Sequence, residues 1–523
     1  MRKYINYLGA ATLLALMSIN FSSCDRDFEE YNQDPFAITN EDLERDFKLV
    51  GEPFINIIQN IYVHTPAWVT QLQQNLIGDV YSGYMMPPTP FAGNSNNMNY
   101  NLVDGWNTWA WNPAYQNVMA PGLDVITNAG DKFPEFVAWL KIAQVSAMHR
   151  VSDMFGPIIY TSFGQVGADG SIAYDCVEDA YNAFFIDLGD GIDELTNYVN
   201  ANPGKQPFTN FDEVYGGDIT KWIQYANSLR LRLAIRISKV DPARAKQEAE
   251  ASINHPLGVM EANDGNFTVK NSIPHPMNTI NNAWNDIRMG APMESILVGY
   301  NDPRVDSYFR PSNIVPGEYK GIRIGIPIAD KGDYVTFSGL QDLGDVQLMV
   351  CSEVYFLRAE GALRGWDMGG TAQELYEAGV RQSFEQHGLG GVDAYLADNS
   401  STAIDYIDAF NNDNSINALS NVTIAWDNGA DFETNLERII TQKWIAMFPD
   451  GQEAWSEYRR TSYPPLFPVV LNNSNGEIDT DEQIKRIKYP SSEYAQNPTG
   501  VQGAIDCLGG SDIGGVSLWW DID

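Results

Sequence analysis

Apolar side chains recur at intervals of three and four residues along several segments of the chain, the spacing that places them on one side of an α-helix. Between residues 220 and 240 this stripe consists of Trp222, Ala226, Leu229, Leu233 and Ile237. Similar stripes predict helices over residues 350–366 and 433–448, and further helices are predicted over 135–154, 178–199, 242–253 and 371–387. Because each helix must bury its apolar side against a neighbour, the chain is predicted to be mainly α-helical.

Several of these helices are joined in pairs by short turns. Asp241 and Pro242 separate one pair, and proline suits the first turn of the following helix. Gly369 and Gly370 separate another pair, and Thr371 is a residue type that caps helix N-termini. Stacked helix pairs of about 34 residues are typical of tetratricopeptide-like solenoids. The sequence therefore predicts such pairs at about 135–199, 220–253, 350–387 and 433–460.

Long irregular stretches lie between the predicted pairs. Residues 87–112 and 254–288 are rich in Pro, Asn, Gly and aromatics, and residues 398–431 are dominated by Asn, Asp and Ser. Stretches of this length within a compact protein are more often binding loops than connectors. We expect variable ligand-binding loops at about 79–112 and 254–330, with short strands at 320–328 and 422–426.

The N-terminus has the pattern of a secretory signal. Arg2 and Lys3 precede an uncharged apolar stretch that is too short for a transmembrane helix, and small residues then lead into Cys24. This resembles a bacterial lipobox, so residues 1–23 are predicted to be removed and Cys24 to carry several acyl chains, since one chain anchors weakly. The alternative is an ordinary signal peptide with Cys24 as a chance thiol.

An acidic run at residues 25–30 follows the cysteine. It resembles the surface-export signal of one group of Gram-negative bacteria, although it could also be a solvated tether. We predict an acylated tether over residues 24–40 and a single domain over residues 41–523. No later stretch of about 18 apolar residues exists, so nothing else in the sequence predicts a membrane span.

The composition excludes some classes of function and favours others. Asp and Glu number 68 against 33 Lys and Arg, which gives a net charge of −35 and excludes nucleic acid as a partner. A hydrophobic fraction of 44% excludes a disordered acidic chain. The 13 Trp, 26 Tyr and 23 Phe exceed what a core needs and indicate a ligand surface. Of Cys176, Cys351 and Cys507, at most one pair can form, and three buried free thiols are the expected outcome.

A series of short motifs runs along the chain. They are Phe28-Glu29-Glu30-Tyr31-Asn32-Gln33-Asp34-Pro35, Gly299-Tyr300-Asn301-Asp302-Pro303-Arg304, Ser352-Glu353-Val354-Tyr355-Phe356-Leu357-Arg358-Ala359-Glu360, the stretch from Gln442 to Arg460, and Arg486-Ile487-Lys488-Tyr489-Pro490 followed by Glu493, Tyr494 and Asn497. In this order they resemble the SusD/RagB family of nutrient-binding outer-membrane lipoproteins, over essentially the whole chain.

The resemblance implies both a fold and a function. The implied fold is four tetratricopeptide-like helix pairs that support an irregular ligand-binding region. The implied function is to capture an oligosaccharide, or in some members a peptide, at the cell surface and to deliver it to a SusC-like TonB-dependent transporter in the outer membrane. Members of the family are not enzymes.

Two regions have the composition of a sugar site. A sugar ring packs its C–H face on an aromatic ring, while amides, carboxylates and Arg bind its hydroxyl groups. The candidate ligand residues in the first region are Asp79, Tyr81, Tyr84, Met85, Phe91, Asn94, Tyr100, Asn101, Trp106 and Trp109, and those in the second are His275, Asn278, Asn281, Trp284 and Arg288. For each aromatic residue the alternative is packing in the core.

No motif predicts catalysis or a cofactor. The chain lacks a nucleophile elbow, a phosphate loop and a zinc helix motif, and its five histidines are scattered. Neighbours of Asp413 suggest calcium, but the Asp/Asn-Gly loop pattern is not met, so no cofactor is expected. Two alternatives to glycan binding remain open: a peptide binder of the same fold, and an extracellular glycoside hydrolase, which would need two carboxylates at a defined separation.

Overall fold

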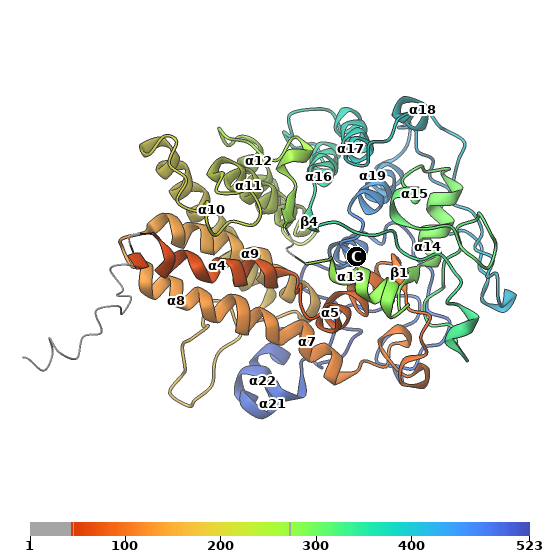
Figure 1. Cartoon of the computed structure of the whole chain (residues 1–523), viewed down its shortest axis with the longest axis horizontal. Helices are drawn as coiled ribbons and strands as arrows, with labels where there is room; N and C mark the ends of the chain where they lie inside the picture. The colour runs from red at the N-terminus through yellow and green to blue at the C-terminus, as the bar shows by residue number, and fades with distance from the viewer. Residues whose placement is uncertain (1–42, 45, 271–272, 523) are drawn as a thin grey trace, which may run out of the picture. The chain divides into compact units, whose positions relative to one another are not determined.

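The computed structural model describes residues 43–44, 46–270 and 273–522 (Figure 1). The predicted signal peptide, Cys24 and the tether lie outside these residues. Contacts divide the chain into Met1–Leu49 and Val50–Asp523, and the second unit holds the helix pairs, loops and sites described below. In the described ranges, no helix is both long enough and apolar enough to cross a bilayer.

Four helix pairs dominate the structure, and the predicted mainly α-helical fold is confirmed. They are α9 (Pro134–Phe155) with α10 (Val177–Ala201), α11 (Ile219–Arg236) with α12 (Pro242–Ile253), α16 (Cys351–Leu363) with α17 (Ala372–Gln386), and α19 (Phe432–Ala446) with α20 (Gly451–Thr461). The expected cap is present at α17, where the Thr371 side chain accepts a hydrogen bond from the backbone N–H of Glu374.

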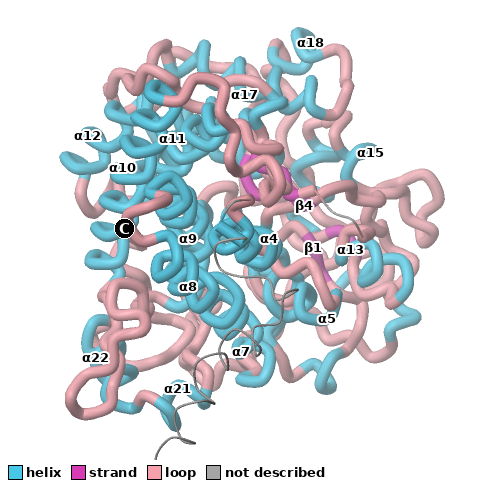
Figure 2. The backbone as a smooth tube through the Cα atoms, turned by 60° about the vertical axis from the view of Figure 1, so that its left-hand side comes forward, coloured by secondary structure: helices cyan, strands magenta, loops and turns pink. Residues whose placement is uncertain are grey.

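The pairs stack on one another in sequence order. Helix α10 packs against α9 and α11, α11 packs against α16, and α16 packs against α17 and α19. Figure 2 shows α8 to α12 gathered on one side, while the loop-rich part with α5, α13 and β1 lies on the other. The helical stack therefore supports a region in which loops predominate.

Buried ion pairs join the helix pairs to one another. The Arg236 guanidinium of α11 lies 2.5 Å from both Glu453 and Glu457 of α20, and Arg232 lies 2.7 Å from Glu353 of α16. All five side chains are at most 2% exposed. Each charge thus has an opposite charge in contact, which offsets the large cost of removing it from water.

Further α-helices fill the rest of the unit. They are α4 (Lys48–Ile61), α5 (Ala67–Thr70), α6 (Gly78–Tyr81), α7 (Asp104–Ala114), α8 (Ala120–Ala129), α13 (Pro276–Asn278), α14 (Ala291–Met293), α15 (Val305–Tyr308), α18 (Val392–Leu396), α21 (Ser491–Gln496) and α22 (Pro498–Cys507). Helix α7 lies within a stretch predicted to be irregular, and a π-helical turn (Tyr115–Met119) connects it to α8. The prediction of loop over residues 104–112 was therefore wrong.

Strands are few and short. β1 (Met85–Met86) pairs antiparallel with β3 (Arg288–Met289), and β2 (Phe267–Val269) pairs antiparallel with β4 (Val346–Met349). The predicted strands at 320–328 and 422–426 are absent from the described chain, apart from one isolated bridge between Gly290 and Ile322. In residues 320–328 the chain turns at Gly325, which has a φ of +72°, so its backbone groups bond to several different segments.

The cysteines also differ from expectation. Cys176, just before α10, forms a disulfide with Cys507 at the end of α22. Cys351 is a buried free thiol, as predicted. The pairing was missed because the two cysteines are 331 residues apart in sequence, and only the fold brings their Cα atoms to within 5.5 Å.

Candidate functional site

Partly exposed aromatic side chains reach the surface as two contacting pairs. Trp68 and Trp109 meet edge to face with ring centroids 4.6 Å apart, and Phe91 and Trp106 do so at 5.7 Å. Trp68 is 42% exposed, and the other three are partly exposed. We call these four residues, together with the partly exposed Trp284, the aromatic face.

Local structure explains how three of these rings are presented. Trp106 and Trp109 are three residues apart on α7, so they lie on the same side of that helix. Phe91 begins a tight turn in which Ala92, Gly93 and Asn94 all have positive φ, between 50° and 64°. Non-glycine residues rarely adopt this conformation, and where they do, a binding site is often nearby.

Polar groups border the aromatic face, and we call Gln71, Thr89, Asp286 and Lys331 the polar rim. Lys331 Nζ lies 2.5 Å from Asp286 Oδ1 and donates to the Trp284 carbonyl at 2.6 Å. The Thr89 hydroxyl and the Gln71 amide also donate to the Asp286 carboxylate. Asp286 therefore joins segments near Trp68, Phe91 and Trp284.

The predicted ligand residues Asn94, Asn278 and Asn281 are engaged with the backbone instead. Each amide donates to a carbonyl oxygen and accepts from the N–H of the same residue: Asn94 with Ile328, Asn278 with Leu343 and Asn281 with Leu340. A carboxamide has the same donor and acceptor as a peptide group, so it pairs with one in this way. These side chains fix loops, and both atoms of each amide group are engaged by the backbone rather than free for a sugar.

Five other predicted ligand residues lie in the core. The structure buries Asp79, Tyr81, Tyr84, Met85 and Tyr100, each at most 3% exposed. Tyr84, for example, packs against the Trp444 ring at 5.0 Å, and its hydroxyl donates to the Trp444 carbonyl. Aromatic composition alone does not show whether a ring stacks on a sugar or packs in the core. Burial keeps these five side chains away from the surface.

His275 and Arg288 are also structural. His275 caps α13 by accepting a hydrogen bond from Met277 N–H, and burial lowers its pKa to about 3, so the ring is neutral at pH 7. The Arg288 guanidinium donates to the backbone carbonyls of Val335 and Ile287, and burial lowers its pKa to about 10. Both side chains are buried and are hydrogen-bonded within the protein.

Asn101 remains accessible at one edge. Its amide donates to Ser95 Oγ at 2.6 Å. It lines an open, polar cavity of about 580 Å³ together with Asn472, Asn473 and Asn475. The structure thus leaves five of the predicted ligand residues accessible to a ligand: Phe91, Asn101, Trp106, Trp109 and Trp284.

Three residues of the candidate site were not predicted from the sequence: Trp68, Asp286 and Lys331. Asp286 lies inside the second predicted region, between Trp284 and Arg288, whereas Trp68 and Lys331 lie outside both. The signal that could have indicated Trp68 is its position directly after Thr65-Pro66-Ala67, a proline-bounded turn where a large apolar side chain has little to pack against.

The chemical groups of the site suit binding. Among the residues that the structure describes, no three His, Cys, Asp or Glu side chains come together as metal ligands. Partly exposed rings beside a paired carboxylate and ammonium offer apolar contact together with directional hydrogen bonds. A helical-repeat scaffold that presents such a surface on its loops defines a class of ligand-binding proteins.

Comparison with known proteins identifies the family. Residues 30–521 match the sequence profile of the SusD-like family, described as Susd and RagB outer membrane lipoprotein, and the chain belongs to this family. Its members are binding proteins and not enzymes, and so is this chain. The resemblance seen in the sequence is thereby confirmed. No curated protein matches the sequence.

Solved structures agree with this assignment. A chitin-binding SusD homolog from Flavobacterium johnsoniae is 48% identical, with a TM-score of 0.89, over 91% of this chain and 99% of that one. A SusD homolog from Bacteroides vulgatus is 35% identical, with a TM-score of 0.87 and the same coverage. One from Bacteroides uniformis is 38% identical, with a TM-score of 0.83, again over 91% and 99%.

Proposed function

We propose that this protein is a cell-surface lipoprotein that binds chitin oligosaccharides on its aromatic face and delivers them to a SusC-like TonB-dependent transporter. The observation that carries the proposal is the two pairs of partly exposed rings, Phe91 with Trp106 and Trp68 with Trp109, which α7 links because it carries one tryptophan of each pair. The similarity to a chitin-binding relative at 48% identity supports the choice of glycan.

The chemistry of chitin fits this surface. Each β-1,4-linked N-acetylglucosamine unit has an apolar ring face, hydroxyl groups and an acetamido group. The rings supply apolar contact, and the polar rim supplies a donor, Lys331, and an acceptor, Asp286, for the hydroxyl and amide groups. Binding of this kind needs no cofactor.

Anchoring completes the proposal. Residues 1–23 would be removed, Cys24 would carry the acyl chains, residues 24–40 would form the tether, and the domain from residue 41 onward would face the cell exterior. Cys24→Ala should release the protein into the soluble fraction, and continued membrane association would contradict the lipobox.

The ligand is tested with the purified chain from residue 25 onward. Titration calorimetry with chitin oligosaccharides should show saturable binding, and cellulose oligosaccharides of equal length should bind more weakly because they lack acetamido groups. Tight binding of lysine-rich peptides with no binding of either glycan would replace this proposal with a peptide-binding role. Delivery is tested in cells, where deletion of the gene for a SusC-like transporter should abolish uptake of labelled chitin oligosaccharide while leaving surface binding intact.

A further inference from the structure

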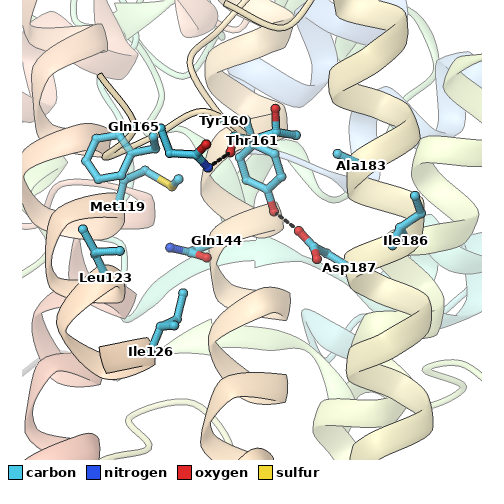
Figure 3. A pocket seen from close by; sticks show the side chains of 11 residues that line it. Met119, Leu123, Ile126, Gln144, Tyr160, Thr161, Gln165, Ala183, Ile186 and Asp187 are labelled. Carbon is cyan, nitrogen blue, oxygen red and sulfur yellow. Dashed lines mark hydrogen bonds between the residues drawn. The ribbon is translucent and has the colours of Figure 1, made fainter. Parts of the chain in front are cut away.

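A second hollow lies on the helical stack, and no residue of the aromatic face or the polar rim lines it. It is a cavity of about 470 Å³ between α8 and α10, with α9 at its floor (Figure 3). Its lining is mostly apolar and includes Met119, Leu123, Ile126, Phe163, Ala183 and Ile186. Cavities of this size are typical of ligand sites.

Large apolar side chains on both edges of this cavity are exposed to solvent. Leu123 and Ile126 of α8 are 43% and 45% exposed, and Ile186 of α10 is 61% exposed. Each would gain about 25 cal/mol for every Å² removed from water. Isolated exposed apolar residues are common, but three around one hollow indicate a surface that another molecule covers.

The floor presents an unpaired amide. Gln144 of α9 is 8% exposed, and Figure 3 shows its carboxamide directed into the cavity. It has no side-chain hydrogen bond to any residue in the described part of the chain. Gly122 leaves room for it, since a Cβ there would lie 2.3 Å from Gln144 Nε2. A ligand with a matching donor and acceptor would pair with this amide on the cavity floor.

A peptide group is such a ligand group. Elsewhere in this protein Asn94, Asn278 and Asn281 each pair through both amide atoms with the backbone of a single residue. Gln144 has the same carboxamide and can form the same pair with the backbone of an extended segment.

A second, acidic cavity lies further along α10. Asp187 lines the first cavity, while Asp190, Asp193 and Glu194 line a neighbouring cavity of about 490 Å³. Lys141 lies between the two, 3.1 Å from Asp187 and 2.6 Å from Asp190. These positions recur every three or four residues, so they share one side of α10. Asp131 lines the second cavity as well, so one lysine faces five carboxylates and this end of the groove is negative.

We propose that this groove along α10 binds an extended segment of a partner protein, with apolar side chains at the Ile186 end and Lys or Arg at the Glu194 end. From Ala183 to Asn197 the helix rises about 21 Å, which about six extended residues would span. An acyl chain offers neither cations for the carboxylates nor a peptide group for Gln144, and a neutral glycan offers no cation. The proposal does not depend on what the aromatic face binds.

The test is a selection of random hexapeptides displayed on phage, using the chain from residue 25 onward. Peptides that combine Leu, Ile, Val or Phe with Lys or Arg should be enriched. The enriched peptides, made synthetically with a fluorescein label, should bind the protein in a fluorescence polarisation assay. Their affinity should fall in 0.5 M salt. Enrichment of no peptide, or of acidic or uncharged ones, would overturn the proposal.

Variants then locate the site. Ile186→Asp should weaken peptide binding at least tenfold, whereas Ile407→Asp, at an apolar residue 53% exposed in a distant loop, should leave it unchanged. Gln144→Met should weaken it about threefold to tenfold, since it removes the amide at similar volume. An equal loss in Ile407→Asp, no loss in Ile186→Asp, or displacement of the peptide by lauric acid would each contradict a polypeptide groove here.

Discussion

Trp68 stands edge-on to Trp109, with 4.6 Å between the ring centroids, although one belongs to α5 and the other to α7. Trp68 is also 42% exposed, the largest exposure within the aromatic face. An indole held in this way by a second indole offers a rigid apolar surface at little cost in side-chain entropy.

Trp68→Ala is expected to weaken binding of chitin oligosaccharides about tenfold, or about 1.4 kcal/mol, because it removes the most exposed ring of the aromatic face. Its melting temperature should stay close to that of the wild type, since much of the side chain is already in water. Titration calorimetry and thermal unfolding measure the two effects. Ile407→Ala, an exposed apolar residue of a different loop, is the control. Unchanged affinity would remove Trp68 from the site.

Arg460→Met should destabilise the protein by about 3 kcal/mol, because it removes the one cation that two buried carboxylates share, although each keeps another basic partner. Arg460 lies 2.6 Å from Glu360 and 2.7 Å from Glu457, and all three are at most 2% exposed. Urea unfolding gives the difference. Arg381→Met is the matched control: its pair with Asp393 is 45% and 84% exposed and should contribute less than about 1 kcal/mol. Equal effects of the two variants would contradict this account.

Asp79→Asn should change how stability depends on pH. Burial, with the nearby Asp450 charge, raises the pKa of Asp79 to about 7. A carboxyl group with a raised folded-state pKa contributes stability that is complete below its unfolded pKa near 4 and is lost as pH rises to 7. The wild type should therefore lose up to about 1.4 kcal/mol per pH unit in this window relative to the variant.

Urea unfolding of both proteins at pH 4, 5.5, 7 and 8 measures this difference. The stability of the variant relative to the wild type should be higher at pH 8 than at pH 4. Asp124→Asn, at an exposed position on α8, provides the comparison for an ordinary surface carboxylate. Parallel curves for wild type and Asp79→Asn would show that Asp79 does not titrate as proposed.

Replacement of both Cys176 and Cys507 by serine should lower the free energy of unfolding by about 2–5 kcal/mol, because the disulfide closes a very long loop in the unfolded chain. Chitin binding should persist, since neither cysteine belongs to the aromatic face. Thiol titration in denaturant should find one free thiol in the chain from residue 25 onward before reduction and three after it. Three thiols without reduction would rule out the bond.

The scaffold was predictable because its signal is local. The stripe of apolar residues in 220–240 lies almost entirely within α11, and the proline at 242 begins α12 as expected. Each of these features depends on residues only a few positions apart. The ion pair between Arg236 and Glu457 was not predictable, because it joins residues 221 positions apart in the sequence.

The candidate site was predicted only in part. Residues Trp106 and Trp109 were identified from composition, but so were Tyr81 and Tyr84, which turn out to be core. Asn94 was chosen as a sugar ligand, yet its amide pairs with the backbone of Ile328, which is 234 positions away. Residue type indicates what a side chain can do, whereas its partner depends on the complete fold.

The sequence by itself thus determined the helix pairs, the exclusion of nucleic acid by charge and the resemblance to the SusD/RagB family, because periodicity, composition and motifs are properties of neighbouring residues. Only the tertiary structure decided which rings reach the surface and which asparagine amides are hydrogen-bonded to loop backbone. It also decided which cysteines pair and that the Gln144 amide faces a cavity. These outcomes depend on burial, and burial results from contacts between segments far apart in the chain.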